Sequence, residues 1–364
     1  MSDSRVTNLA RVLVDYSLGV KRGETVSVAG SSAAEPLFVA LYESLICRGA
    51  FPVLHMTPPG VSEILYKQGK PHHFTTLTPY QRAAARCMDK SVRIISETNT
   101  RALSSANPAR QAELQKTNRP LTNVLLKKPW VLTLFPTAAY AQDAEMSLRE
   151  FEDFVYGATY ADEDDPVKAW KAVKKHQDAV IRRLKGAKEI HIVGPETDLK
   201  FSVAGRTFIN SCGTHNMPSG EVFTGPVEDS TEGTIRYDYP VCHAGREVDG
   251  IRLVFRKGRV VEASATKNEA FLQAMLDLDK GARRLGELGI GTNRKIQTFI
   301  KNILFDEKIG GTIHLALGKS YPETGGKNVS ALHWDMIKDL RRGGAIYVNG
   351  KLFQKDGNFV GVKG

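Results

Sequence analysis

Hydrophobic positions in the first half of the chain form short apolar runs that alternate with helical patterns. Residues 6–18 place Leu9, Val12 and Leu13 on one face of a helix, and an apolar run follows at 24–29. The alternation continues with helical patterns at 35–48, 62–68 and 79–89 and apolar runs at 51–56, 92–96 and 130–135. Such alternation predicts an open α/β sheet.

From residue 189 onward the pattern changes to short strands and tight turns. Apolar runs separated by Gly or Pro lie at 189–193, 198–203 and 207–210. The segments 251–256 and 259–264 flank Lys257 and Gly258, which predicts a hairpin. A helix predicted over 268–285 would end at Gly286 and deliver Glu287 at its C-terminal end.

The expected fold is α/β, with two domains joined by a helix over 166–184. An open α/β domain is predicted at 1–185, with a role in shaping access or pairing subunits. An α+β domain is predicted at 186–364, and it carries the candidate chemistry described below. A chain of 364 residues is long enough for this arrangement.

Composition indicates a soluble cytoplasmic protein. Hydrophobic residues make up 41% of the chain and charged residues 25%, as in ordinary globular proteins. The N-terminus lacks an apolar signal core, and no run approaches the roughly 18 apolar residues of a membrane span. The four cysteines lack C-x-x-C spacing, which predicts reduced thiols and no thiolate zinc site.

The formal charge of +10 suggests one alternative, a non-catalytic nucleic-acid binder. Lysines and arginines concentrate at 168–188, where apolar residues recur at helical intervals, which is typical of a solvated helix face. The chain has no basic motif interleaved with aromatic residues of the RNA-binding type. We therefore expect neither nucleic acid nor a membrane as a partner.

Five potential metal ligands lie in the second half. His333 and Asp335 are two residues apart, so on a strand both side chains point to the same face. Glu221, Glu287 and His314 lie upstream in glycine-rich segments. Two imidazoles with three carboxylates, and no thiolate, suit Zn, Co, Mn or Fe(II) at a catalytic site. Five ligands exceed the needs of one tetrahedral ion, which favours two cations with a bridging carboxylate for hydrolysis.

Four segments occur in an order that resembles the thermophilic metallo-aminopeptidase family of the aminopeptidase T type. They read NMPSGEVFTGP from Asn216, GELGIGTN from Gly286, GTIHLALG from Gly311 and HWD from His333. The segments LVDYSLGVKRGETV from Leu13 and TLFPTAAYAQ from Thr133 are also similar to that family. The resemblance therefore covers most of the chain.

The resemblance implies a dinuclear site whose ligands are Glu221, Glu287, His314, His333 and Asp335. It also places Tyr321, seven residues after His314, at the metals. Homodimers and short-peptide substrates are implied in the same way.

The predicted function is a cytoplasmic metallo-aminopeptidase that releases N-terminal residues from short peptides. Two divalent cations, Zn or Co, would activate a bridging water, with Glu287 as the bridging carboxylate. Tyr321 would ligate a metal or donate a hydrogen bond to the developing oxyanion. The sequence does not name a general base, although Glu228 and Asp229 follow the first motif.

A mononuclear Fe(II) ring-opening dioxygenase is the alternative enzyme class. His314, His333 and Asp335 form the two-histidine, one-carboxylate set of such enzymes. A single iron would leave Glu221 and Glu287 without a role, which favours the dinuclear interpretation.

Overall fold

The structure is a computed structural model that describes residues 3–243 and 246–361. The chain divides into two compact units. Unit 1 contains Met1–Trp170 and Gly213–Pro218, and unit 2 contains Lys171–Cys212 and Ser219–Gly364. The chain thus returns briefly to unit 1 before it completes unit 2. In the part of the chain that is described, no helix is both long enough and apolar enough to span a membrane.

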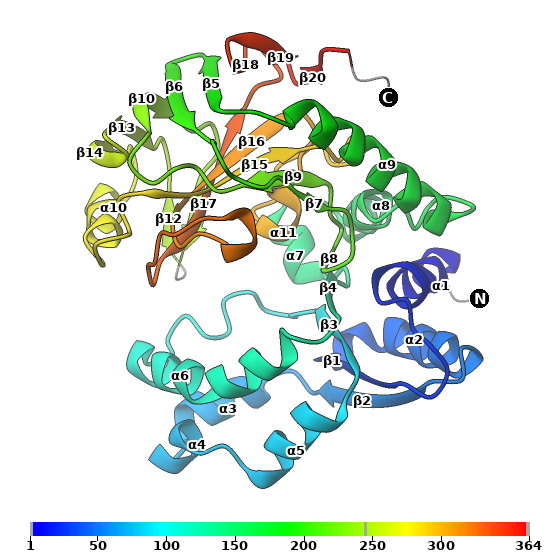
Figure 1. The fold of residues 1–364 in the computed structure, drawn as a ribbon. Coiled ribbons are helices and arrows are strands. Elements are labelled where there is room, and N and C mark those ends of the chain that lie inside the picture. The colour runs from blue at the N-terminus through cyan, green and yellow to red at the C-terminus, as the bar shows by residue number, and fades with distance from the viewer. Residues whose placement is uncertain (1–2, 244–245, 362–364) are drawn as a thin grey trace. The chain divides into compact units, whose positions relative to one another are not determined.

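Unit 1 is built on a parallel five-stranded sheet (Figure 1). Its strands, in spatial order, are β2 (Phe51–Thr57), β1 (Thr25–Ser31), β3 (Lys90–Ile95), β4 (Trp130–Leu134) and β8 (Asn216–Met217). Every pairing in this sheet is parallel, as expected where helices connect successive strands. The predicted open α/β sheet is confirmed.

Helices precede the first strand of this sheet and lie in the connections between its strands. They are α1 (Ser4–Arg11), continued by a π-helix (Val12–Ser17), α2 (Glu35–Cys47), α3 (Val61–Gln68), α4 (Pro71–Thr75), α5 (Pro79–Cys87), α6 (Pro108–Leu125), α7 (Ala138–Asp143) and α8 (Leu148–Ala158). Capping boxes begin α5 at Thr78 and α8 at Ser147. The hydrophobic pattern did not predict α6, because none of its residues is buried and it therefore lacks an apolar face.

The helix predicted over 166–184 is present as α9 (Pro166–Leu184), which begins in unit 1 and ends in unit 2. Its first residue is proline, whose fixed backbone angle suits the first turn of a helix.

Unit 2 contains three antiparallel sheets (Figure 1). The eight-stranded sheet has the order β14 (Arg259–Ser264), β13 (Arg252–Arg256), β10 (Glu232–Arg236), β6 (Thr197–Ser202), β5 (Glu189–Gly194), β18 (Ala345–Val348), β19 (Lys351–Lys355) and β20 (Asn358–Phe359). The five-stranded sheet has the order β17 (His333–Asp339), β16 (Thr312–Gly318), β15 (Leu285–Gly291), β9 (Glu221–Thr224) and β7 (Ile209–Ser211). A small hairpin pairs β11 (Val241–His243) with β12 (Arg246–Val248).

One cluster of buried side chains joins the two larger sheets of unit 2. Ile190 and Phe201 come from the eight-stranded sheet, and Leu288, Leu315 and Trp334 come from the five-stranded sheet. Strands β9, β15, β16 and β17 of the five-stranded sheet therefore each have one face packed against the core. The opposite face is left for other side chains.

The helix predicted over 268–285 is shorter than expected. Helix α10 (Glu269–Leu276) ends early, and a short helix α11 (Ile303–Asp306) lies further along the chain. The Asp279 carboxylate accepts hydrogen bonds from the backbone N–H groups of Gly281 and Ala282, at 2.8 and 3.0 Å. This local turn competes with helix continuation. The prediction that Glu287 follows a helix is wrong, because Glu287 lies inside strand β15.

Candidate metal centre

The proposed ligands lie on the face of the five-stranded sheet that is turned away from the core. On β17, Trp334 and Met336 join the core cluster, so His333 and Asp335 point to the other face. On β9, Val222 joins the core cluster, which turns Glu221 to the same side as these ligands. The predicted strand around His333 and Asp335 is confirmed.

Small residues lie beside the ligands on neighbouring strands. Glu221 is paired with Gly291, His314 with Gly289, and His333 with Gly318. Ala316 is paired with both Glu287 and Asp335. These pairings explain the glycine-rich composition of the motifs, because larger side chains would fill the space in which the ligands converge.

Gly289 shows this requirement most directly. A Cβ atom at this position would lie 1.9 Å from His314 Cε1 and 2.1 Å from His314 Nε2. Real Cβ atoms do not approach other atoms this closely, so any side chain at residue 289 would displace the imidazole. Glycine at this position is therefore a condition for the observed orientation of His314.

A β-bulge turns Glu287 toward the same face. Leu285 pairs with Leu317 and Glu287 pairs with Ala316, so one extra residue, Gly286, lies between these pairs on β15. Leu285 and Leu288 both join the core cluster. In a regular strand Glu287 would share the face of Leu285. The bulge reverses this, which is a common use of bulges near functional sites.

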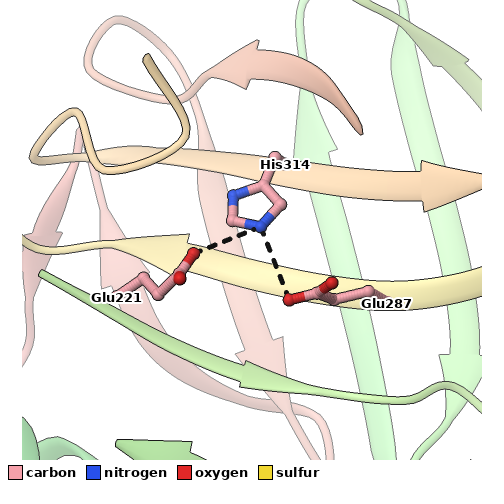
Figure 2. Close-up of side chains that lie close together, drawn as sticks. All are labelled: Glu221, Glu287 and His314. Atoms are coloured by element: carbon pink, nitrogen blue, oxygen red, sulfur yellow. Dashed lines mark ion pairs between the residues drawn. The ribbon is translucent and has the colours of Figure 1, made fainter. Parts of the chain in front are cut away.

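Three groups of possible ligand atoms result. They are Glu221, Glu287 and His314; Glu287, His333 and Asp335; and Glu307, His314 and Asp335, each with atoms within 4.8 Å of one another. Figure 2 shows the first group, in which the imidazole of His314 lies above the two carboxylates. His314 Nε2 is 3.3 Å from Glu221 Oε2 and 3.7 Å from Glu287 Oε1.

The two carboxylate oxygens of Glu287 face different imidazoles. Oε1 faces His314, while Oε2 lies 3.4 Å from His333 Nε2. His333 Nε2 is also 3.6 Å from Asp335 Oδ2. Glu287 thus belongs to two ligand groups at once, the arrangement required of a bridging carboxylate.

Backbone carbonyls orient both imidazoles. His314 Nδ1 lies 3.1 Å from the carbonyl oxygen of Glu307, and His333 Nδ1 lies 2.9 Å from that of Lys319. We assign the Nδ1–H group as the donor, since a carbonyl can only accept. Nε2 of each ring is then directed at the carboxylates, as in metal-ligating histidines.

The residues fit divalent cations. Glu221 Oε2 and Asp335 Oδ1 are buried and accept no hydrogen bond from the described residues. Buried carboxylate oxygens without partners are costly unless a cation binds them. The ligand groups contain four carboxylates, those of Glu221, Glu287, Glu307 and Asp335, and the buried Lys308 pairs with two of them, Glu221 and Glu307. The excess negative charge and the nitrogen and oxygen donor set match divalent metals.

The sequence model of one family, described as thermophilic metalloprotease (M29), matches residues 2–359. The chain belongs to the M29 metalloprotease family. Aminopeptidase 2 of Geobacillus stearothermophilus is 27% identical over 355 residues, which covers 88% of this chain and 84% of that protein. Aminopeptidase T of Thermus thermophilus is 27% identical over 351 residues, covering 86% and 84%.

The fold is also similar to a solved structure. Wild-type AmpT from Thermus thermophilus superposes with a TM-score of 0.84 at 23% identity, and the match covers 98% of this chain and 99% of that one. The predicted resemblance and the α/β fold class are confirmed. The predicted enzyme class is confirmed as well, because an M29 protein is a metal-dependent peptidase, a hydrolase. The dioxygenase alternative is not supported.

Buried charge in this M29 protein perturbs the ionisation of the ligand residues. Burial disfavours the charged form of Glu287, but the adjacent imidazoles of His314 and His333 outweigh burial and lower its pKa to about 2. Burial also disfavours the imidazolium of His314, yet Glu287, Glu221 and Asp335 raise its pKa to about 10. Burial likewise opposes protonation of His333, and Glu287 and Asp335 raise its pKa to about 9. Without metal, the carboxylates therefore recruit protons onto both imidazoles.

Glu307 and Lys308 belong to the site and were missed in the sequence. Lys308 is completely buried, its Nζ lies 2.9 Å from Glu221 Oε1, and it also pairs with Glu307. Burial disfavours the charge of Lys308, but Glu221 and Glu307 outweigh burial and raise its pKa. The available signal was a run of three charged residues, 306–308, between the apolar segment 303–305 and Ile309, shortly before His314.

Tyr321 lies beside the site, as the resemblance implied. Its ring is 5.2 Å from that of His333 and 5.7 Å from that of Phe223, which follows Glu221 by two residues on β9. Burial, with the nearby carboxylates, raises the pKa of Tyr321. The phenol therefore keeps its proton and remains a hydrogen-bond donor.

The two suggested general bases lie outside the three ligand groups. The Glu228 carboxylate is 2.7 Å from Arg206 Nη2 and accepts the backbone N–H of Lys327 at 2.6 Å. Burial opposes its ionisation, but these partners prevail and lower the pKa of Glu228. Such a carboxylate is a weak base, and Asp229 adjoins it in the sequence. Neither residue is among the groups that could hold a metal.

Proposed function

We propose that this M29 protein is an aminopeptidase that removes the N-terminal residue of short peptides at a pair of divalent cations. The observation that carries the proposal is the position of Glu287, whose oxygens face His314 at 3.7 Å and His333 at 3.4 Å. The names of the related proteins, all aminopeptidases, support the choice of substrate.

Glu287 divides the ligands into two sets. One cation would bind Glu221, Glu287 and His314, and the other Glu287, His333 and Asp335. Zn or Co suits these imidazole and carboxylate donors. A mononuclear iron site would use His314, His333 and Asp335 alone. Each of the three groups of possible ligand atoms instead includes a glutamate, Glu221, Glu287 or Glu307, which supports a dinuclear site.

When bound, such cations polarise the scissile carbonyl and lower the pKa of water from about 15.7 toward about 7, which supplies a nucleophile at neutral pH. The residues of the chain then orient the reaction. The carbonyls of Glu307 and Lys319 hold His314 and His333 with Nε2 directed inward. The protonated phenol of Tyr321, beside His333, would donate a hydrogen bond to the developing oxyanion.

We also propose that the protein is a homodimer that pairs through unit 1. Helix α2 exposes Val39, Tyr42 and Ile46 at 62%, 46% and 49%, and Phe51 on β2 is 65% exposed. Helix α2 contacts β2, which is the terminal strand of its sheet. Apolar surface of this kind marks interaction sites. The charge-introducing variant Tyr42→Glu should give a monomer in light scattering, and an unchanged mass would contradict this interface.

The cytoplasm is the proposed location. Cys47, Cys87 and Cys242 are exposed free thiols. Exposed free thiols are usual in a reducing compartment.

The function is tested by metal content together with hydrolysis of aminoacyl chromogenic substrates. The expected result is two ions per chain, with hydrolysis that disappears on chelation and returns with Zn or Co. One ion per chain with full activity would contradict the dinuclear site. A metal-loaded protein that cleaves only N-terminally blocked peptides would contradict aminopeptidase activity.

A further inference from the structure

A cavity of about 300 Å³ adjoins one side of the candidate metal centre in unit 2. His333 and Asp335 line it, whereas Glu221 and His314 do not. The cavity therefore lies beside one of the two proposed cations and away from the other. Its volume is at the lower end of the about 300–1,000 Å³ found for ligand sites, which suits one amino-acid side chain and not an extended peptide.

Apolar side chains form much of the cavity wall. They come from the β11 segment, the 299–303 segment and β17, and are Pro240, Val241, Phe299, Ile303, Trp334 and Ile337. Trp334 and Ile337 are buried within the sheet, and Phe299 stacks on Tyr239 at 4.7 Å with an interplanar angle of 14°. The wall is therefore preformed by packed residues.

The two acidic residues of the lining other than Asp335 have partners of their own, and the exposed Lys301 also lines the cavity. Glu247 lies 2.8 Å from Lys267 Nζ, which compensates its carboxylate. Asp306 is only 2% exposed, and its Oδ1 accepts the backbone N–H of Ile300 at 2.8 Å. A basic substrate side chain would find these two carboxylates already engaged. An apolar side chain would instead exchange water for the apolar wall.

We propose that this cavity binds a large apolar side chain, such as leucine or phenylalanine, of the first residue of the peptide. The proposal rests on the aminopeptidase function proposed above. An aminopeptidase substrate has one residue on the N-terminal side of the scissile bond, and its remainder must extend away from the metals. The cavity has room for one side chain and is lined by His333 and Asp335, so it can hold the side chain of that first residue.

The test compares dipeptides of the Xaa-Ala and Ala-Xaa series, with Ala, Leu, Phe, Glu or Lys as Xaa, using metal-loaded protein. We expect kcat/KM for Leu-Ala and Phe-Ala to exceed that for Ala-Ala by at least about tenfold, the scale for added methylenes in an apolar pocket. A preference that follows the second residue, or favours Glu or Lys at the first, would overturn the proposal.

Ile303→Trp tests the cavity itself. Ile303 is 47% exposed, so a larger side chain there can enter the cavity without disturbing the core. The ratio of Phe-Ala to Ala-Ala hydrolysis should fall about tenfold, with unchanged metal content. The matched control is Ile64→Trp on α3, where Ile64 is 56% exposed and does not line the cavity. Equal ratios in wild type and Ile303→Trp would refute the assignment.

A binding measurement separates this proposal from the proposed function. If metal-loaded protein hydrolyses no dipeptide, the proposed aminopeptidase function is wrong. Calorimetry with free L-phenylalanine and L-alanine then tests whether the cavity binds a large apolar side chain. Binding of L-phenylalanine that exceeds that of L-alanine and is lost in Ile303→Trp would support the cavity assignment. Equal or absent binding of the two amino acids would refute it.

Discussion

Both units bury lysine side chains, and the surroundings of Lys90 in unit 1 differ from those of Lys308 in unit 2. In unit 1, Lys90 is 7% exposed, lies 2.8 Å from Glu24 Oε2 and donates to the carbonyl of Gly19 at 2.9 Å. One positive charge meets one negative charge there. In unit 2, Lys308 meets Glu221 and Glu307 within a cluster of four carboxylates. A balanced buried pair serves structure, whereas an unbalanced cluster requires further cations.

The sheet of unit 1 and the five-stranded sheet of unit 2 also differ in the side chains that their faces carry. The parallel sheet of unit 1 places the apolar residues Val26, Val28 and Val92 in its core. The antiparallel strands of unit 2 give one face to the core and the other to charged ligands. An antiparallel sheet allows this division because its two faces can have different environments.

The largest expected effect is that of Glu287→Gln, compared with Glu24→Gln in unit 1. The amide cannot bridge two cations, so hydrolysis should fall far beyond the about 100-fold loss that follows removal of a residue that only orients a ligand. Glu24→Gln should retain activity. Steady-state kinetics with metal analysis and circular dichroism would check this. Near-normal turnover by folded Glu287→Gln would contradict the assignment of Glu287 as the bridging carboxylate.

The second comparison is Lys308→Met with Lys90→Met. Removal of one partner from a buried pair costs about 3–5 kcal/mol, because the remaining charge stays buried. Lys308→Met should lose stability on this scale without metal, and added Zn or Co should restore much of it, since cations then compensate Glu221. Metal should not rescue Lys90→Met. Denaturant unfolding with and without metal measures both, and equal rescue of the two variants would contradict the comparison.

Tyr321→Phe should lower kcat by about 100-fold, the scale for one lost oxyanion donor. Metal content should stay at the wild-type level if the hydroxyl acts only on the oxyanion. Tyr156→Phe is the control, because it removes a tyrosine hydroxyl from α8 of unit 1, where Arg5 lies over the ring. A large loss of metal from Tyr321→Phe would instead assign the phenol to metal binding.

The smallest effect is a pH dependence of metal uptake. Nearby carboxylates raise the pKa of His314 to about 10 and of His333 to about 9, so both imidazoles are protonated at pH 7 without metal. Metals bind the neutral ring, so uptake must release protons, and affinity must rise about tenfold per pH unit for each proton released. Calorimetry in buffers of different ionisation enthalpy would show this release. Uptake without release would contradict the raised pKa values.

Much of the fold was predictable, because its signals are local. The alternation of apolar runs with helical patterns predicted the open α/β sheet, and two-residue spacing placed His333 and Asp335 on one strand face. The resemblance selected the same residues that the structure brings together in the ligand groups, Glu221, Glu287, His314, His333 and Asp335. The boundary expected after residue 185 remains a prediction.

Other features had no local signal. The helix predicted to precede Glu287 was wrong, because the Asp279 turn ends it and the bulge at Gly286 sets the direction of Glu287. Lys308 was missed because a lysine in a short charged stretch such as 306–308 is normally a solvated residue. Only its burial beside Glu221 assigns it to the site.

The sequence by itself determined the kinds of ligand, their strand periodicity and the family, since these depend on residue identity and short spacing. The tertiary structure decided which oxygens face which imidazoles, how the glycines make room for them, and that Lys308 compensates Glu221. The physical reason is strand register. Pairing across β9, β15, β16 and β17 joins residues far apart in the chain, and a one-residue shift would turn every ligand on that strand to the opposite face.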